Sequence, residues 1–150
     1  MQHAHQFMDK SPLTVTADLS VIDLSRLLLD NNADGACVLD EKKRLIGVVT
    51  TMDLVFREKR VHMPSFFAFM DAVLPLGLER TEQELLKISG TTVGAIMSRN
   101  VQKVDPDARL DVIAARMVED HLTIVPVVDN GQLVGVITKK VLLQAATHKG

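Results

Sequence analysis

Aromatic side chains are scarce in this sequence. Phe, Trp and Tyr together make up 3% of its 150 residues, and Trp and Tyr are absent. Hydrophobic residues still account for 47% of the chain, so we expect a core of aliphatic side chains. The low aromatic content does not exclude a stable fold, because 150 residues suffice for about one ordinary domain.

Basic clusters and long apolar runs are also lacking. The formal net charge is −2, and the short basic run over 42–44 lies between two apolar segments, as expected of a solvated turn. Without a larger block of Lys and Arg, binding to nucleic acid is not expected. No stretch of about 18 apolar residues is present, so no membrane span is expected either.

The sequence has one cysteine, Cys37, within an apolar segment. A single cysteine excludes a disulfide within the chain, which fits a reducing compartment and a cytoplasmic location. We expect Cys37 to be a small buried hydrophobic residue. The first residues, Met1 to His5, lack a signal-peptide pattern and are expected to form a flexible terminus.

Motifs that carry catalysis are missing as well. The sequence contains no metal-ligand cluster, no nucleophile and base at a meaningful spacing, and no glycine-rich phosphate loop. We therefore predict that the chain is not an enzyme. No catalytic residue, metal site or required cofactor is expected.

The sequence does contain an internal repeat. Residues 8–40 align with residues 97–129 at an offset of 89, and after a gap of one residue the offset becomes 88. Apolar and special positions match over about fifty residues, which chance explains poorly. The matched pairs include Met8 and Met97, Val15 and Val104, Asp40 and Asp129, Gly47 and Gly135, and Thr50 and Thr138.

Each copy predicts the same order of elements. A short strand, over 13–16 or 102–104, precedes a helix whose apolar residues recur every three or four positions. Asp18 and Asp107 lie at the expected helix starts, where a carboxylate is favourable. Two strands and a last helix follow, over 36–39, 45–50 and 52–60 in the first copy and 124–128, 133–138 and 139–146 in the second.

The segment between the copies, over 58–95, is not a plain linker. Its apolar series is broken near Pro75 and Gly77, and Gly90 ends a second helical stretch, so the pattern predicts a helical hairpin. Such an insert could bind a partner or a second subunit, or it could pack on the chain's own repeats. The sequence leaves both interpretations open.

The closing motifs of the two copies point to a known family. Gly-Val-Val-Thr-Thr-Met-Asp spans 47–53, Gly-Val-Ile-Thr-Lys-Lys-Val spans 135–141, and Val-Pro-Val-Val-Asp spans 125–129. With these motifs the chain resembles a tandem pair of cystathionine-β-synthase (CBS) domains, or Bateman module, of the stand-alone bacterial and archaeal kind. The resemblance covers 7–57 as repeat 1 and 96–146 as repeat 2.

The resemblance implies a fold and a function. The expected fold is α/β (α+β), with two βαββα units packed sheet to sheet about a pseudo-twofold axis and two clefts between them. The expected function is regulatory energy sensing, through an adenosine-containing ligand of the AMP, ADP and ATP class or S-adenosylmethionine. The family also implies a homodimer and a regulated protein, which the sequence does not identify.

Thr50 and Asp53 are the leading candidates for a ligand contact. Thr50 ends a predicted strand and Asp53 lies in the first turn of the next helix, where its carboxylate can accept hydrogen bonds from both ribose hydroxyls. The same spacing is close to a helix-capping box, and the two roles are compatible. The resemblance places the adenine near the first strands of repeat 1, with Val15, Thr16, Ala36 and Val38 as candidates.

The second copy differs at one important position. Thr138 is kept, but Val141 stands where repeat 1 has Asp53, and Val cannot accept a hydrogen bond from a ribose. By the family pattern the second cleft is therefore impaired, and we predict one competent site per chain, or a second site that recognises its ligand differently.

Partners for a phosphate are less clearly indicated. His121 and Lys139 are the candidates, but some nucleotide-binding relatives carry basic residues just before the second strand, where this chain has Asp34-Gly35. This departure argues against binding of a diphosphate or triphosphate. The alternative function is a ligand-free scaffold for dimerisation and partner binding.

Overall fold

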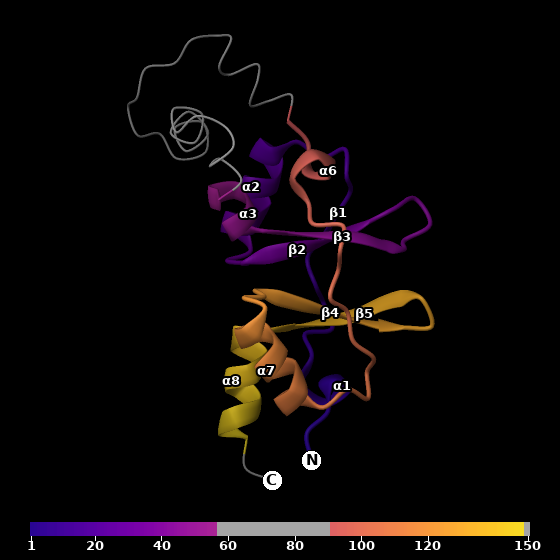
Figure 1. The fold of residues 1–150 in the computed structure, drawn as a ribbon. Coiled ribbons are helices and arrows are strands. Elements are labelled where there is room, and N and C mark those ends of the chain that lie inside the picture. Colours follow the sequence, from indigo (N-terminus) through magenta and orange to yellow (C-terminus); the bar gives the residue numbers. More distant parts are fainter. Residues whose placement is uncertain (57–90, 149–150) are drawn as a thin grey trace.

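The computed structural model describes residues 1–56 and 91–148, and these residues form two similar halves (Figure 1). Repeat 1 contains β1 (Thr14–Val15), α2 (Val21–Asp30), β2 (Gly35–Leu39), β3 (Leu45–Thr50) and α3 (Thr51–Phe56). Repeat 2 contains α7 (Leu110–Glu119), β4 (Ile124–Asp129), β5 (Gln132–Thr138) and α8 (Lys139–Thr147). Two short helices, α1 (Ala4–Phe7) and α6 (Val93–Ile96), precede the repeats. The helical hairpin expected within 58–95 lies outside the described residues, except for its last part, 91–95.

The strands form two small sheets. In repeat 1, β1 runs parallel to β2, and β2 runs antiparallel to β3. In repeat 2, β4 and β5 are antiparallel, and the strand expected over 102–104 is reduced to a single parallel bridge between Val104 and Val127. The expectation of a strand there was wrong in extent. The bridge nevertheless repeats the pairing of Val15 with Val38.

The two sheets face each other, and the longer helices cover their outer sides (Figure 1). Cys37, Ile124 and Val136 form a buried cluster between the sheets, with Leu45, Val48 and Leu133 packed against it. This arrangement confirms the expected α/β fold of paired CBS-type units and the buried position of Cys37. Burial raises the pKa of the Cys37 thiol to about 12, because the thiolate would lose its hydration. No helix within the described residues is long and apolar enough to cross a membrane.

Each short helix packs against the repeat that it does not directly precede. Figure 1 shows α1 beside repeat 2 and α6 beside repeat 1. Ala4 is fully buried in the core of repeat 2, and its N–H donates to the Ala108 carbonyl over 2.8 Å. Val93 is fully buried in the core of repeat 1, and its N–H donates to the Leu19 carbonyl over 2.8 Å. The expectation of a flexible N-terminus is therefore wrong from Ala4 onward, because burial of an apolar side chain holds this helix in place.

The methionine that follows each short helix packs against a glycine of the opposite repeat. A Cβ at Gly47 would lie 2.6 Å from Met97 Sδ, and a Cβ at Gly135 would lie 2.7 Å from Met8 Sδ. The four residues are the matched methionines and glycines of the internal repeat. The sequence pattern therefore marks a contact between repeats, since only glycine leaves room for the sulfur.

The helix starts differ from the sequence expectation. Ser20 caps α2, its Oγ accepting a hydrogen bond from the Asp23 N–H over 3.1 Å. Asp18 instead accepts a hydrogen bond from the Thr16 hydroxyl. In α7 the cap position is Arg109, without a side-chain cap. The carboxylates at 18 and 107 thus lie before the helices rather than at their caps.

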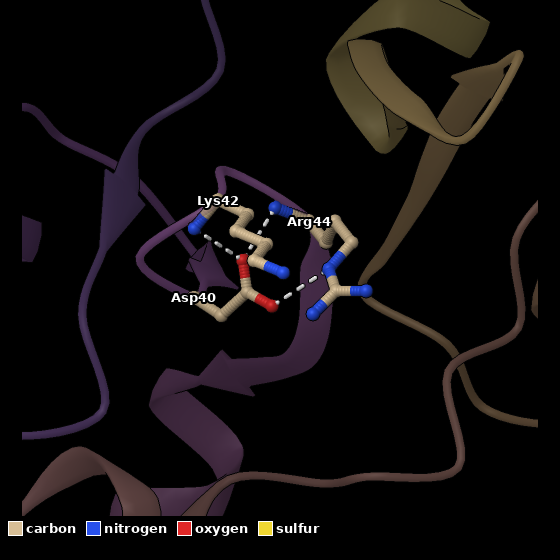
Figure 2. Close-up of polar contacts among 3 residues, drawn as sticks. All are labelled: Asp40, Lys42 and Arg44. Carbon is tan, nitrogen blue, oxygen red and sulfur yellow. Dashed lines mark hydrogen bonds and ion pairs between the residues drawn. The ribbon is translucent and has the colours of Figure 1, made fainter.

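The turn between β2 and β3 is held by one carboxylate (Figure 2). Asp40 Oδ1 accepts hydrogen bonds from the backbone N–H groups of Lys42 (2.9 Å) and Arg44 (2.8 Å), and Oδ2 accepts one from Arg44 Nε (3.0 Å). These hydrogen bonds, first that from the Arg44 backbone, lower the pKa of Asp40. The basic run at 42–44 is therefore an ordered, solvated turn.

Candidate functional site

A cleft of about 220 Å³ lies where the two repeats meet, beside the start of α3. Repeat 1 contributes the end of β3 and the first turn of α3. Repeat 2 contributes the loop after α7 and the first part of β4, and the third wall is residues 98–102, here called the crossing segment. The lining residues are Val48, Thr50, Met52, Asp53, Ser98, Asn100, Val101, Gln102, His121, Leu122, Thr123, Ile124 and Pro126.

Thr50 and Asp53 hold each other at the start of α3. The Thr50 N–H donates to Asp53 Oδ2 over 2.9 Å, and the Asp53 N–H donates to Thr50 Oγ1 over 3.2 Å. This reciprocal pair is a capping box, and it fixes the carboxylate at the edge of the cleft. Asp53 Oδ1 takes no hydrogen bond from the described residues, so capping leaves one carboxylate oxygen for a ligand.

The crossing segment is tied to repeat 1 by backbone hydrogen bonds. The Val48 N–H donates to the Ser98 carbonyl over 3.0 Å, and the Ser98 N–H donates to the Val48 carbonyl over 2.8 Å. Both residues line the cleft. A ligand in the cleft would therefore contact repeat 1, repeat 2 and the segment that joins them.

The cleft is lined by both apolar and polar side chains. Val48, Leu122 and Ile124 provide apolar surface from both repeats. Ser98, Asn100, Gln102 and Thr123 provide neutral hydrogen-bonding groups, and Asp53 provides a carboxylate. Such a lining can pack against a flat apolar ring and can also hydrogen-bond to hydroxyl groups.

The residues expected to contact adenine lie elsewhere. Val15, Ala36 and Val38 are buried in the core of repeat 1, at 7%, 1% and 0% exposure, where they pack against α2 and α6. Thr16 is exposed and hydrogen-bonded to Asp18. The structure does not bring these four residues to the cleft with Asp53, because alternation along β2 turns Ala36 and Val38 toward the helices and Cys37 toward the other sheet.

The apolar walls were not indicated by the sequence patterns. Ile124 and Pro126 take the positions in repeat 2 that Gly35 and Cys37 take in repeat 1. Their strand is buried on both faces, so alternation does not show which side chains face the cleft. The available signal was the repeat itself, since paired sheets bring residues of the second copy to the helix start of the first.

His121 does lie at the cleft, whereas Lys139 is not among its lining residues. His121 follows α7 and adopts a left-handed backbone conformation with φ of 54°, as Asn32 does at the matched position with φ of 49°. Both side chains are exposed.

The start of α8 in repeat 2 is built differently. Thr138 Oγ1 accepts a hydrogen bond from the Val141 N–H over 3.3 Å, so half of the capping box is kept. Val141 is 3% exposed and belongs to the core of repeat 2. The position that carries a carboxylate at the cleft in repeat 1 is therefore an apolar core position in repeat 2.

Among the described residues, no group of three or more His, Cys, Asp or Glu side chains could hold a metal ion.

Comparison with known proteins identifies the family. The sequence model of the CBS domain matches residues 4–59 and 93–148, so the chain belongs to the CBS domain family and carries two copies. An uncharacterized protein of Methanocaldococcus jannaschii is 30% identical over 145 residues, which cover 91% of this chain and 86% of the relative. The chain spans 62% of another relative, the chloroplastic CBS domain-containing protein CBSX1 of Arabidopsis thaliana.

Solved structures share the fold. A CBS-domain containing protein of Agrobacterium tumefaciens superposes with a TM-score of 0.75 at 19% identity, covering 97% of this chain and 99% of that one. The protein CBSX2, solved in complex with AMP, superposes with a TM-score of 0.71 at 25% identity, covering 97% of this chain and 96% of that one. These matches confirm the resemblance drawn from the closing motifs and the tandem arrangement.

Proposed function

We propose that the chain is a cytoplasmic regulatory protein that senses an adenosine-containing ligand in this cleft, from the AMP, ADP and ATP class or S-adenosylmethionine. The observation that carries the proposal is the capped Asp53 carboxylate at the edge of a cleft between two CBS repeats. A related CBS protein that is 25% identical was solved with AMP, which supports this ligand class.

The ribose is the part of the ligand that Asp53 would recognise. Neighbouring ribose hydroxyls can both donate to one carboxylate, and hydrogen bonds to a charged acceptor are the stronger kind. Thr50 keeps the carboxylate in place, and Oδ1 remains an acceptor. The adenine would lie against the apolar wall formed by Val48 and Ile124.

The position of the cleft suggests how binding would regulate. The ligand would contact both repeats and the crossing segment, so its affinity depends on their relative arrangement. A ligand that binds one arrangement more tightly shifts the population toward it. A regulated protein that recognises this arrangement would then respond to the ligand.

Calorimetry of the full chain with AMP, ADP, ATP, S-adenosylmethionine and NADH tests the proposal. We expect saturable binding of at least one adenosine ligand, and a loss of roughly 10- to 100-fold in affinity for Asp53→Ala, since a charged hydrogen bond contributes about 1.5–3 kcal/mol. Absence of binding by all five ligands would refute the sensing function.

A matched pair of variants separates ligand contact from capping. Thr50→Ala and Thr138→Ala each remove the same side-chain cap, one beside the cleft and one in repeat 2. We expect Thr50→Ala to weaken binding and Thr138→Ala to leave it within about twofold of wild type, with similar small losses of stability. Equal loss of affinity in both would show that the effect is structural and that Thr50 does not contact the ligand.

A scaffold that forms a homodimer is the second candidate function. Val112 and Val118 of α7 are 51% and 75% exposed, and Leu143 of α8 is 66% exposed. Exposed apolar side chains on neighbouring outer helices are a common feature of subunit contacts (Figure 1). Sedimentation with and without ligand tests this: a dimer that resists dilution and binds no ligand favours the scaffold, and a monomer at all concentrations rejects it.

A further inference from the structure

The side chains that line the cleft in the described part of the chain carry little positive charge. Among the described residues that line it, none is Lys or Arg, and His121 is the only one that can carry a positive charge. The fixed charge at the wall is the carboxylate of Asp53. A phosphate chain entering the cleft would meet this negative charge and would find no cation of fixed charge on the described wall.

One cation that contacts a lining residue of the cleft is already engaged. Arg116 of α7 donates from Nη2 to Gln102 Oε1, behind the crossing segment. This contact uses the amide oxygen of Gln102, a lining residue, so that the NH₂ group of its side chain is the hydrogen-bonding group left over. The guanidinium therefore orients a neutral group and does not line the cleft itself.

The backbone at the start of α3 offers little to a phosphate. The Thr51 N–H donates to the Asp34 carbonyl over 2.9 Å. The N–H groups of Thr50 and Asp53 donate to the side chains of the capping box. Phosphates at helix starts are bound by backbone N–H groups that lack other partners, and three of these groups are occupied here.

The size of the cleft also favours a ligand with few phosphates. Its volume of about 220 Å³ is below the roughly 300–1,000 Å³ typical of small-molecule sites. A nucleoside can fill such a space, whereas a dinucleotide or a long phosphate chain would extend into solvent.

From these observations we infer that the cleft selects a nucleoside carrying no more than one phosphate and discriminates against nucleoside di- and triphosphates. The inference rests on the proposed function and narrows its ligand class. Selection arises because Asp53 repels additional phosphates and the surrounding donors are neutral.

The test is calorimetry of the full chain with adenosine, AMP, ADP and ATP without divalent cations, at low and at high salt. We expect adenosine and AMP to bind within about tenfold of each other, and ATP at least about tenfold more weakly than AMP at low salt. The difference between AMP and ATP should shrink at high salt, because salt screens the repulsion.

A charge variant sharpens the test. Asn100 is exposed and lines the cleft, so Asn100→Lys adds a cation to a lining that otherwise has no Lys or Arg among the described residues. We expect this variant to raise the affinity for ATP about tenfold relative to the affinity for adenosine. Gln132→Lys is the matched control, since it adds the same charge at the exposed far end of β5.

The outcomes separate the inference from the proposed function. Binding of ATP as tight as that of AMP, or equal gains from Asn100→Lys and Gln132→Lys, overturns the selectivity and leaves adenosine sensing intact. Absence of binding by all four ligands overturns the selectivity, and absence of binding by S-adenosylmethionine and NADH as well overturns the sensing function.

Discussion

The two repeats begin their last helices with the same threonine and use the third residue after it in opposite ways. In repeat 1, Asp53 completes a capping box and presents a carboxylate to the cleft. In repeat 2, Val141 is 3% exposed and anchors α8 in the core. The comparison shows that one backbone geometry can place a carboxylate at a cleft or an apolar side chain in a core, and that a single side chain decides which.

Substitution of Gly135 and Gly47, the glycines that contact Met8 and Met97, is expected to give the largest effect on stability. At Gly135 a Cβ would lie 2.7 Å from Met8 Sδ and 2.9 Å from the Asp9 carbonyl oxygen, whereas at Gly47 the backbone contact, to the Ser98 carbonyl oxygen, is 3.1 Å. Overpacking costs about 1–3 kcal/mol. We expect Gly135→Ala to lose about 2–3 kcal/mol and Gly47→Ala about 1 kcal/mol in urea unfolding. Equal losses of stability would mean that the contacts at Gly135 and Gly47 are equally tight.

Substitutions at the matched positions Val141 and Asp53 are expected to give the next largest effect on stability. Val141→Ala leaves a cavity in the core of repeat 2 and should cost about 2 kcal/mol, whereas Asp53→Ala removes a cap and should cost about 1 kcal/mol or less. Only Asp53→Ala should reduce ligand affinity. Urea unfolding and calorimetry on the same samples check both statements, and a reversed order of stabilities would contradict the comparison.

The sheet interface carries a pH-dependent difference, which has no effect at neutral pH. The pKa of Cys37 is about 12 in the folded chain against an ordinary value near 9, so above pH 9 the unfolded chain releases a proton that the folded chain keeps. The free energy of unfolding should therefore fall as pH rises from about 9 to about 12. Pro126, at the matched position, has no proton to lose.

Cys37→Ala isolates this contribution. Its own loss of packing shifts the whole curve, but the slope of stability against pH should be shallower than that of the wild type between about pH 9 and about pH 11. Parallel curves would show that the thiol does not retain its proton on folding.

The hairpin turns give the smallest effect. Asp40 holds the turn of repeat 1 through three hydrogen bonds, whereas the turn of repeat 2 relies on Asn130 and Gly131, both with positive φ. We expect Asp40→Ala to lower the unfolding midpoint slightly and Asp129→Ala to leave it unchanged. Because the pKa of Asp40 is lowered, its contribution is present above pH 3.8 and is lost as pH falls through the lowered value. Wild type and Asp40→Ala should then converge in acid; a constant difference would contradict this account.

Much of the fold followed from the sequence by local rules. Alternation and three-to-four spacing predicted the longer strands and helices, and the repeat identified the tandem arrangement. The short helices α1 and α6 escaped these rules because each has four residues, too few for a periodic pattern. Their position is set by burial of Ala4 and Val93 in the opposite repeat.

The candidate site, like the fold, was only partly predictable from the sequence. The Thr50 and Asp53 pair was evident from the sequence, because a capping box depends on residues three apart at one helix start. The sequence by itself also determined the asymmetry with Val141. The tertiary structure alone decided that the crossing segment and repeat 2, rather than the first strands of repeat 1, form the rest of the cleft. The reason is that β2 is buried on both faces, so only the packing of the second sheet shows which side chains line the cleft.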